Sequence, residues 1–222
     1  MLFDRDGTLI EDVPYNGEPG RVRPMPGARA AVEAVRGRGL SLGVVSNQSG
    51  VARGLLTRER VAAVRRRVEE LLGPFGVWAV CPHGPDDGCG CRKPAPGLVH
   101  AACAELGVDP ARTAVVGDIG ADLAAARAAG ARGVLVATPV TRPEEVAAAE
   151  ESAPDLLTAV RRLLDPEDAP LDPEDAPLGS EDAPLGSEDA EGPPVQGPPA
   201  QSPPVRQSPE HRPAQGPAGG TP

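Results

Sequence analysis

A short apolar run at the start of the chain ends in two aspartates, Asp4 and Asp6, which are followed at once by Gly7 and Thr8. A strand that stops on carboxylates delivers them to the carboxyl edge of a sheet, where ligands of open α/β folds bind. Gly7 frees the backbone there, so one aspartate can present its side chain and the other its carbonyl. Clustered oxygen ligands of this kind suit Mg²⁺. The alternative is a strand end capped by an ordinary Asp-Gly turn. Residues elsewhere in the chain are needed to distinguish a metal site from such a turn.

Strand patterns alternate with helix patterns along the first 164 residues. After the opening strand, apolar strand-like runs cover residues 40–46, 77–80, 113–116 and 133–136. Helical periodicity covers residues 27–38, 57–72, 96–106, 121–129 and 154–164. Strands that alternate with helices predict a parallel sheet with right-handed crossovers. We therefore expect an α/β fold with a mainly parallel, five-stranded sheet and flanking helices.

Residues 11–26 contain prolines and glycines too densely for a helix or a central strand. We expect this stretch to form a flap over the end of the first strand. No large insertion interrupts the pattern elsewhere, which predicts a minimal cap and an open site. Only three residues precede Asp4, whereas a strand inside a sheet usually has about four or more. We therefore expect the native chain to begin upstream of Met1.

The chain divides by composition after Leu164. Residues 165–222 hold 12 acidic and two basic residues, which leaves 20 of each sign before them, so the net charge of −10 belongs to this second part. It repeats a seven-residue unit, LDPEDAP or LGSEDAP, and then becomes Pro-rich. Proline breaks helices, which excludes a coiled coil of period seven. We expect one domain in residues 1–164 and a disordered acidic tail in residues 165–222.

The sequence lacks the features that would indicate a membrane location or a nucleic-acid partner. No run approaches the roughly 18 apolar residues that span a bilayer, and no basic-then-apolar leader opens the chain. We expect a cytoplasmic monomer without a membrane partner. The arginines of residues 58–67 have no aromatic residues among them, so we expect no nucleic-acid site. Arginine outnumbers lysine 21 to 1, which singles out Lys93.

Three cysteines and a histidine form a C-x-H-x₅-C-x-C array, which comprises Cys81, His83, Cys89 and Cys91. Three thiols and one imidazole can close a tetrahedral structural Zn²⁺ site. A disulfide is the alternative, but the absence of a secretory signal favours zinc. Four protein ligands leave no open position, so this zinc would be structural and would fix the exit of the loop at Arg92 and Lys93. Cys103 lies on the apolar face of a predicted helix, where we expect it to be a small core residue.

Four pairs of polar residues fall in loops expected at one edge of the sheet, namely Asp4 with Asp6, Ser46 with Asn47, Arg92 with Lys93 and Asp118 with Asp122. They supply carboxylates for a metal, a hydroxyl and an amide for phosphate oxygens, and two cations. This inventory suits phosphoryl transfer, in which Mg²⁺ and fixed positive groups offset the charge that repels an anionic nucleophile.

Four segments between residues 2 and 136, in the order DRDGT, VVSNQSG, RKPAPG and VGDIGAD, resemble the motifs of haloacid dehalogenase (HAD) superfamily phosphatases. The resemblance implies a Rossmann-like HAD fold. Within the superfamily, the cysteine array together with NQSGVARG is similar to the D-glycero-D-manno-heptose 1,7-bisphosphate phosphatases. The zinc loop also resembles that of the histidinol-phosphate phosphatases, which usually read NQDG where this chain has NQSG.

The resemblance implies a role for each matched residue. Asp4 would be the nucleophile that forms an aspartyl-phosphate. Asp6 would be the general acid and base, with its carbonyl on Mg²⁺. The other implied roles are Mg²⁺ ligation by Asp4 and Asp118, phosphate binding by Ser46, Asn47 and Lys93, sugar or second-phosphate binding by Arg92 and Arg53, and support of these groups by Thr8 and Asp122.

The function that we expect is that of a Mg²⁺-dependent phosphatase with a small-molecule phosphate substrate. The resemblance to the heptose bisphosphate phosphatases implies that this chain converts heptose 1,7-bisphosphate to the heptose 1-phosphate. The alternatives are a histidinol-phosphate phosphatase or another small-molecule phosphomonoesterase. A third alternative, of another class, is a non-catalytic protein that recruits Pro-binding modules through its tail.

Overall fold

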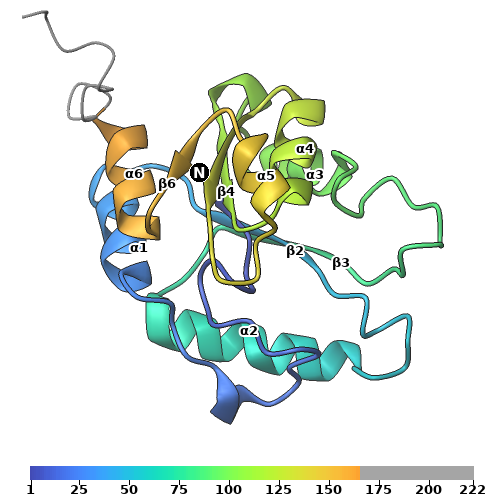
Figure 1. Ribbon diagram of the computed structural model, residues 1–222. Coiled ribbons are helices and arrows are strands. Elements are labelled where there is room, and N and C mark those ends of the chain that lie inside the picture. The colour runs from blue at the N-terminus through green and yellow to red at the C-terminus, as the bar shows by residue number, and fades with distance from the viewer. Residues whose placement is uncertain (166–222) are drawn as a thin grey trace, which may run out of the picture. The chain divides into compact units, whose positions relative to one another are not determined.

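One sheet of six parallel strands organises the chain (Figure 1). The computed structural model describes residues 1–165, so the expected tail lies outside the described residues except for Asp165. The strands are β1 (Leu2–Phe3), β2 (Gly43–Asn47), β3 (Val77–Cys81), β4 (Ala114–Gly117), β5 (Arg132–Val136) and β6 (Ser152–Ala153). Their order is β3-β2-β1-β4-β5-β6. The direction of winding reverses between β1 and β4, as in Rossmann-like folds, whose ligands bind beyond the carboxyl ends of the strands at that point.

Helices cover both faces of the sheet. They are α1 (Ala28–Gly37), α2 (Arg58–Leu72), α3 (Gly97–Leu106), α4 (Gly120–Ala129), α5 (Pro143–Ala147) and α6 (Leu156–Leu164). Helices α1, α2 and α6 pack on one face, and α3 and α4 pack on the other (Figure 1). Within residues 1–165, no helix has both the length and the apolar character needed to cross a membrane. The expected α/β fold with flanking helices is confirmed.

Consecutive strand residues enter opposite hydrophobic cores. Phe3 and Val44 pack in the core under α1, α2 and α6, whereas Leu2 and Val45 pack in the core under α3 and α4. All four side chains are fully buried, which explains why the strands read as unbroken apolar runs. Leu2 is in register with Gly43 on one side and with Val115 on the other. The residues after β1 therefore emerge in the middle of the carboxyl edge.

The sheet has one strand more than the five that the sequence predicts. Strand β6 consists of Ser152 and Ala153 and joins the edge of β5, where Leu135 N donates to Glu151 O at 2.9 Å. Helix α5 is also absent from the prediction. Both elements are too short to show hydrophobic periodicity, since β6 has two residues and α5 has five. The other predicted elements are confirmed, with ends that differ by three residues or fewer.

Residues 11–26 fold back over the end of β1, and we call this segment the flap. Glu11 N donates to Arg23 O at 2.9 Å, and Met25 N donates to Leu9 O at 3.0 Å. A 3₁₀ turn, Pro19–Arg21, lies between these contacts. The dark-blue segment in Figure 1 shows the flap passing beside α2. The expectation of an irregular flap is confirmed.

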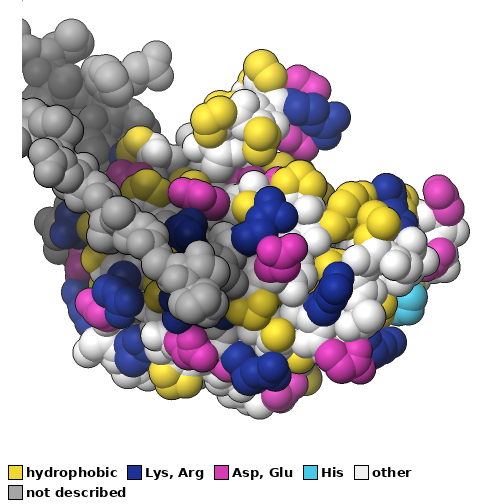
Figure 2. Space-filling view, turned by 90° about the horizontal axis from the view of Figure 1, so that it is seen from below, with side chains coloured by type: hydrophobic (Ala, Val, Ile, Leu, Met, Phe, Trp, Pro, Cys, Tyr) yellow, Lys and Arg dark blue, Asp and Glu magenta, His cyan; other side chains and the backbone are white. Residues whose placement is uncertain are grey.

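Two arginines of α2 form ion pairs with glutamates of the same helix. Arg67 pairs with Glu70 at 2.9 Å and Arg65 with Glu69 at 3.4 Å, and all of these side chains are partly or fully exposed. Figure 2, which views the molecule from the side of α2, shows Lys/Arg and Asp/Glu side chains interspersed on this face. Mixed signs of this kind are typical of a solvated helix face.

Candidate active site

Lys93 lies at the centre of the carboxyl edge. Its Nζ is 2.5 Å from Asp4 Oδ1, 2.5 Å from Asp122 Oδ1 and 2.8 Å from the carbonyl oxygen of Val45, to which it donates. The contact with Asp122 is a buried ion pair. Burial lowers the pKa of Lys93, but the Asp122 and Asp4 carboxylates outweigh it and raise the pKa above the ordinary value. The ammonium therefore stays charged.

Asn47, at the end of β2, holds the backbone of Lys93. Its Oδ1 accepts from Lys93 N at 3.1 Å, and its Nδ2 donates to Lys93 O at 3.0 Å. Both ends of the amide are thus engaged. The sequence predicts that Asn47 binds the phosphate or the substrate, whereas this geometry favours a role in fixing the segment that carries Lys93.

Three buried carboxylates, Asp4, Asp118 and Asp122, offer oxygens that all lie within 4.8 Å of one another. Burial raises the pKa of Asp4 to about 7 against the opposing charge of Lys93. Burial, and then the charges of Asp4 and Asp122, raise the pKa of Asp118 to about 8. Three carboxylates with one ammonium among them leave an excess of negative charge that a divalent cation would neutralise. This donor set therefore fits Mg²⁺.

Asp122 is occupied on both oxygens. Oδ1 faces Lys93, and Oδ2 accepts from the backbone N–H of Ile119 at 3.3 Å. These contacts agree with the supporting role that the sequence predicts for Asp122, and they leave Asp4 and Asp118 as the better placed carboxylates for a cation.

Asp6 faces a different set of partners. Arg5 Nε donates to both of its carboxylate oxygens at 3.0 Å. Gln48 Nε2 donates to Asp6 Oδ2 at 2.9 Å and to Ser46 Oγ at 2.9 Å, so one amide links Asp6 to Ser46. The sequence assigns no role to Arg5 or Gln48, although both lie inside the motifs that mark the site, DRDGT and VVSNQSG.

The turn after Asp6 passes directly against Asp118. Gly7 has φ 78°, and a Cβ at this position would overlap Asp118 Oδ2. Thr8 is 1% exposed, and its hydroxyl has no hydrogen-bond partner within residues 1–165. Buried hydroxyls usually have a partner, and the hydration shell of a bound ion or phosphate would supply one. The supporting role predicted for Thr8 is compatible with this position.

Thr141 holds the loop that carries Asp118. Its Oγ1 donates to the carbonyl oxygen of Asp118 at 2.6 Å, and Thr138 N donates to that same Oγ1 at 2.8 Å. Thr141 precedes α5 in a stretch without hydrophobic periodicity. No sequence signal marks it, because the contact depends on how the chain returns after β5.

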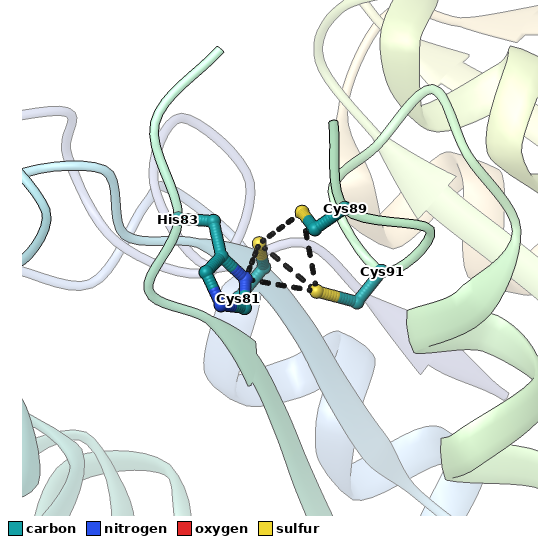
Figure 3. Close-up of side chains that lie close together, drawn as sticks. All are labelled: Cys81, His83, Cys89 and Cys91. Atoms are coloured by element: carbon teal, nitrogen blue, oxygen red, sulfur yellow. Dashed lines mark hydrogen bonds between the residues drawn. The ribbon is translucent and has the colours of Figure 1, made fainter. Parts of the chain in front are cut away.

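Four side chains come together at the end of β3 (Figure 3). They belong to Cys81, which is the last residue of the strand, and to His83, Cys89 and Cys91 in the loop that follows it. Cys91 Sγ is 3.3 Å from Cys81 Sγ, 3.5 Å from Cys89 Sγ and 3.3 Å from His83 Nδ1. Ligands around a tetrahedral zinc with Zn–S bonds of about 2.3 Å are separated by roughly 3.8 Å or slightly less. A disulfide would bring two sulfurs to about 2.05 Å, and all four cysteines of the chain are free. The cluster has the composition and size of a zinc site.

Arg92 and Arg53 lie in loops that border the site. Arg92 Nη1 donates to the carbonyl oxygen of His83 at 3.4 Å, and Arg53 Nη1 donates to the hydroxyl of Tyr15 in the flap at 2.7 Å. A cavity of about 200 Å³ adjoins the site; Arg5 and Ser46 line it together with α2 and β3 side chains that include Arg58 and Trp78.

Comparisons with known proteins agree with this geometry. The model of a family described as HAD-hydrolase-like matches residues 90–163. A protein of Pseudomonas aeruginosa named D-glycero-beta-D-manno-heptose-1,7-bisphosphate 7-phosphatase is 38% identical over 143 residues, which cover 62% of this chain and 80% of the relative. A protein of the same name from Yersinia pestis is 37% identical over 162 residues, which cover 67% and 86%.

Solved structures are similar to this chain as well. One is a D,D-heptose 1,7-bisphosphate phosphatase from B. bronchiseptica in complex with magnesium and phosphate; it has a TM-score of 0.66 and 30% identity and covers 74% of this chain and 97% of its own. Another is a HAD-like phosphatase from Mesorhizobium loti, with a TM-score of 0.61, 34% identity and coverage of 73% and 85%.

Replacement of Gly7 by alanine should destabilise the protein by about 1–3 kcal/mol and disturb the position of Asp118. The matched control is Gly39→Ala, because Gly39 has φ 67° but open space around the added Cβ, and it should cost only about 1 kcal/mol. Urea unfolding of the two variants separates backbone strain from overlap with Asp118. Equal losses in both variants would contradict the close approach at Gly7.

Without Mg²⁺, the free energy of unfolding should fall as the pH rises from about 5 to 8. The pKa values of about 7 for Asp4 and about 8 for Asp118 lie above the ordinary value near 3.9. The folded chain therefore binds more protons than the unfolded chain in this range, and its stability declines with rising pH. Asp118→Asn should flatten this decline in urea titrations at several pH values, and so should saturating Mg²⁺. An unchanged slope in the variant would exclude Asp118 as its source.

Proposed function

The chain belongs to the family of HAD-like phosphatases, and we propose that it removes the 7-phosphate of D-glycero-D-manno-heptose 1,7-bisphosphate to leave the heptose 1-phosphate. The observation that carries this proposal is the set of Asp4, Lys93, Asp118 and Asp122 at one sheet edge, next to a Cys/His loop. The curated relatives that bear the heptose bisphosphatase name support the choice of substrate.

In the first step, a carboxylate oxygen of Asp4 attacks the phosphorus of the substrate. The bond between the phosphorus and the sugar oxygen breaks, and the Asp6 carboxyl donates a proton to that oxygen. The products are the free sugar hydroxyl and an aspartyl-phosphate. The Lys93 ammonium and the Ser46 hydroxyl bind the oxygens of the transferring phosphoryl group, since both lie at the same edge as Asp4.

In the second step, water attacks the phosphorus of the aspartyl-phosphate. Asp6, now a carboxylate, accepts a proton from this water, and the phosphorus–oxygen bond to Asp4 breaks. Inorganic phosphate leaves, and both aspartates return to their starting states. The contacts from Arg5 and Gln48 orient the Asp6 carboxylate for both proton transfers.

The residues present fit Mg²⁺, which when bound neutralises charge on the phosphoryl oxygens. We assign it to Asp4, Asp118 and the backbone carbonyl of Asp6. The excess of buried carboxylates over cations supports this assignment, and so does the magnesium in the B. bronchiseptica relative. We assign Zn²⁺ to the cysteine array, where it would connect the end of β3 to the segment that carries Lys93.

Histidinol phosphate is the competing substrate, because a zinc loop of this kind also resembles that family. The NQSG sequence at residues 47–50 and the names of the relatives favour the heptose. Arg92 and Arg53 are assigned to the sugar or its second phosphate. The monomeric state, the cytoplasmic location, the boundary at residue 164 and the lack of nucleic-acid or membrane partners stay predictions.

Asp4→Asn should lower kcat by about 10⁴-fold or more, because loss of a nucleophile removes the covalent route. The assay follows phosphate release from heptose 1,7-bisphosphate with histidinol phosphate in parallel. Asp86→Asn, an exposed aspartate in the loop after β3, is the control and should keep native turnover. Native turnover by the Asp4 variant would rule out the nucleophile, and faster wild-type hydrolysis of histidinol phosphate would replace the proposed substrate.

Protein purified without chelator should contain about one zinc per chain by elemental analysis. Cys91→Ser removes a thiolate ligand, so this variant should lose the metal. Its turnover should also fall, because the segment that carries Lys93 would no longer be fixed. Cys103→Ser is the matched control, because Cys103 is buried away from the array beside Thr113, and it should retain zinc. Wild-type protein without stoichiometric zinc would count against the site.

A further inference from the structure

A cavity of about 200 Å³ lies between α2 and β3, the outermost strand on that side of the sheet. Most of its lining is apolar and comprises Val51, Val61, Ala62, Trp78, Val80 and Pro82. An apolar cavity of about 150 Å³ holds benzene, so this one has room for a ring-sized molecule. The lining leaves out the cluster of Asp4, Lys93, Asp118 and Asp122. The cavity is therefore a separate space next to the catalytic groups.

Guanidinium groups give this apolar space a positive charge. Arg58 and Arg65 line it from α2, and Arg5 lines it from the turn after β1. Within residues 1–165, no aspartate or glutamate belongs to the lining. Arg65 pairs with Glu69, whereas Arg58 forms no ion pair in the described part of the chain. An unpaired cation beside apolar side chains favours a ligand that has both a negative group and an apolar body.

Arg5 connects the cavity to the proposed proton donor, Asp6. Arg5 is 2% exposed, and its Nε and Nη2 face the carboxylate oxygens of Asp6 at 3.0 and 2.8 Å. A guanidinium has five N–H donors, and these contacts leave the Nη1 donors for another acceptor. Ser46, which is 1% exposed, also lines the cavity and offers its hydroxyl as a second polar group. An acidic group bound here would therefore share the Arg5 guanidinium with Asp6.

We propose that the cavity is an effector site for a small organic anion with an apolar body about the size of one ring. Bound there, the anion accepts from Arg5 and weakens the hold of Arg5 on Asp6, which slows the proton transfers. The effect on turnover rests on the proposed function, whereas binding itself does not. A guanidinium binds carboxylates strongly, and the Trp78 ring supplies an apolar wall. Inorganic phosphate lacks the apolar body, and a neutral ring lacks the charge, so each matches only part of the lining.

The test uses cyclohexanecarboxylate as the probe and cyclohexylmethanol as its neutral counterpart. Trp78 is the only tryptophan in the chain, so its emission reports on the cavity, and neither probe absorbs where tryptophan is excited. Ala62→Phe fills the cavity from α2. The matched control is Ala63→Phe, because Ala63 lies on the same helix but not in the lining. Thermal midpoints check that both variants fold.

A second variant, Arg58→Gln, removes a cation of the lining without filling the space. Kinetic measurements use heptose 1,7-bisphosphate and acetyl phosphate side by side, so that inhibition is measured even if the heptose is not the substrate.

Cyclohexanecarboxylate should change the Trp78 emission saturably in the wild type and bind about tenfold more tightly than cyclohexylmethanol. It should lower kcat about threefold or more with KM little changed, because the anion affects Asp6 rather than substrate binding. Ala62→Phe should lose both responses and keep basal turnover, and Ala63→Phe should behave as the wild type. Arg58→Gln should weaken binding of the anion but not of the alcohol.

No saturable change in emission, equal binding of the two probes, or binding without a fall in kcat would overturn the inference. A rise in KM with kcat unchanged would also overturn it, since the anion would then occupy the substrate's own region. Inhibition of acetyl phosphate hydrolysis in an enzyme that does not hydrolyse the heptose would uphold the inference while the heptose substrate fails.

Discussion

The buried ammonium of Lys93 is the group on which the rest of the site depends. An unpaired charge in this position would be costly, and the Asp4 and Asp122 carboxylates that offset it are themselves buried and need it. The sheet provides the remaining support, since the Val45 carbonyl accepts from Nζ and Asn47 fixes the Lys93 backbone. One ammonium does not neutralise the three carboxylates of Asp4, Asp118 and Asp122. The remaining negative charge fits Mg²⁺, and the two cations together would fit a phosphoryl group.

Three loop segments that bury few apolar side chains position the residues around Lys93. The cysteine array precedes Lys93, Thr141 holds the Asp118 carbonyl, and the flap places Tyr15 beside Arg53. Each is attached to the edge by a few polar contacts, whereas the strands beneath are fixed by two apolar cores. The division is typical of α/β enzymes, in which a rigid sheet positions the loops and the loops carry the residues of the site.

The sequence predicts most of the fold because buried parallel strands and amphipathic helices have regular apolar patterns. It misses β6 and α5, which are too short for any period, and with them Thr141. The candidate residues are predictable where they follow strand ends, as Asp4 and Asp118 do, since the topology brings those ends together. The contacts of Arg5, Gln48 and Tyr15 depend on side-chain direction and on loop conformation, and no spacing in the sequence encodes these.

The proposed mechanism depends on Asp4 as the group that receives the phosphoryl, and trapping of the intermediate is its most direct test. Enzyme mixed with substrate and Mg²⁺ is quenched in acid during the first turnovers, reduced with borohydride and digested for mass spectrometry. Reduction of an aspartyl-phosphate converts that aspartate to homoserine. We expect homoserine at position 4 and unmodified aspartate at positions 6, 118 and 122. Homoserine at another position, or unmodified Asp4 in an enzyme that is turning over, would contradict it.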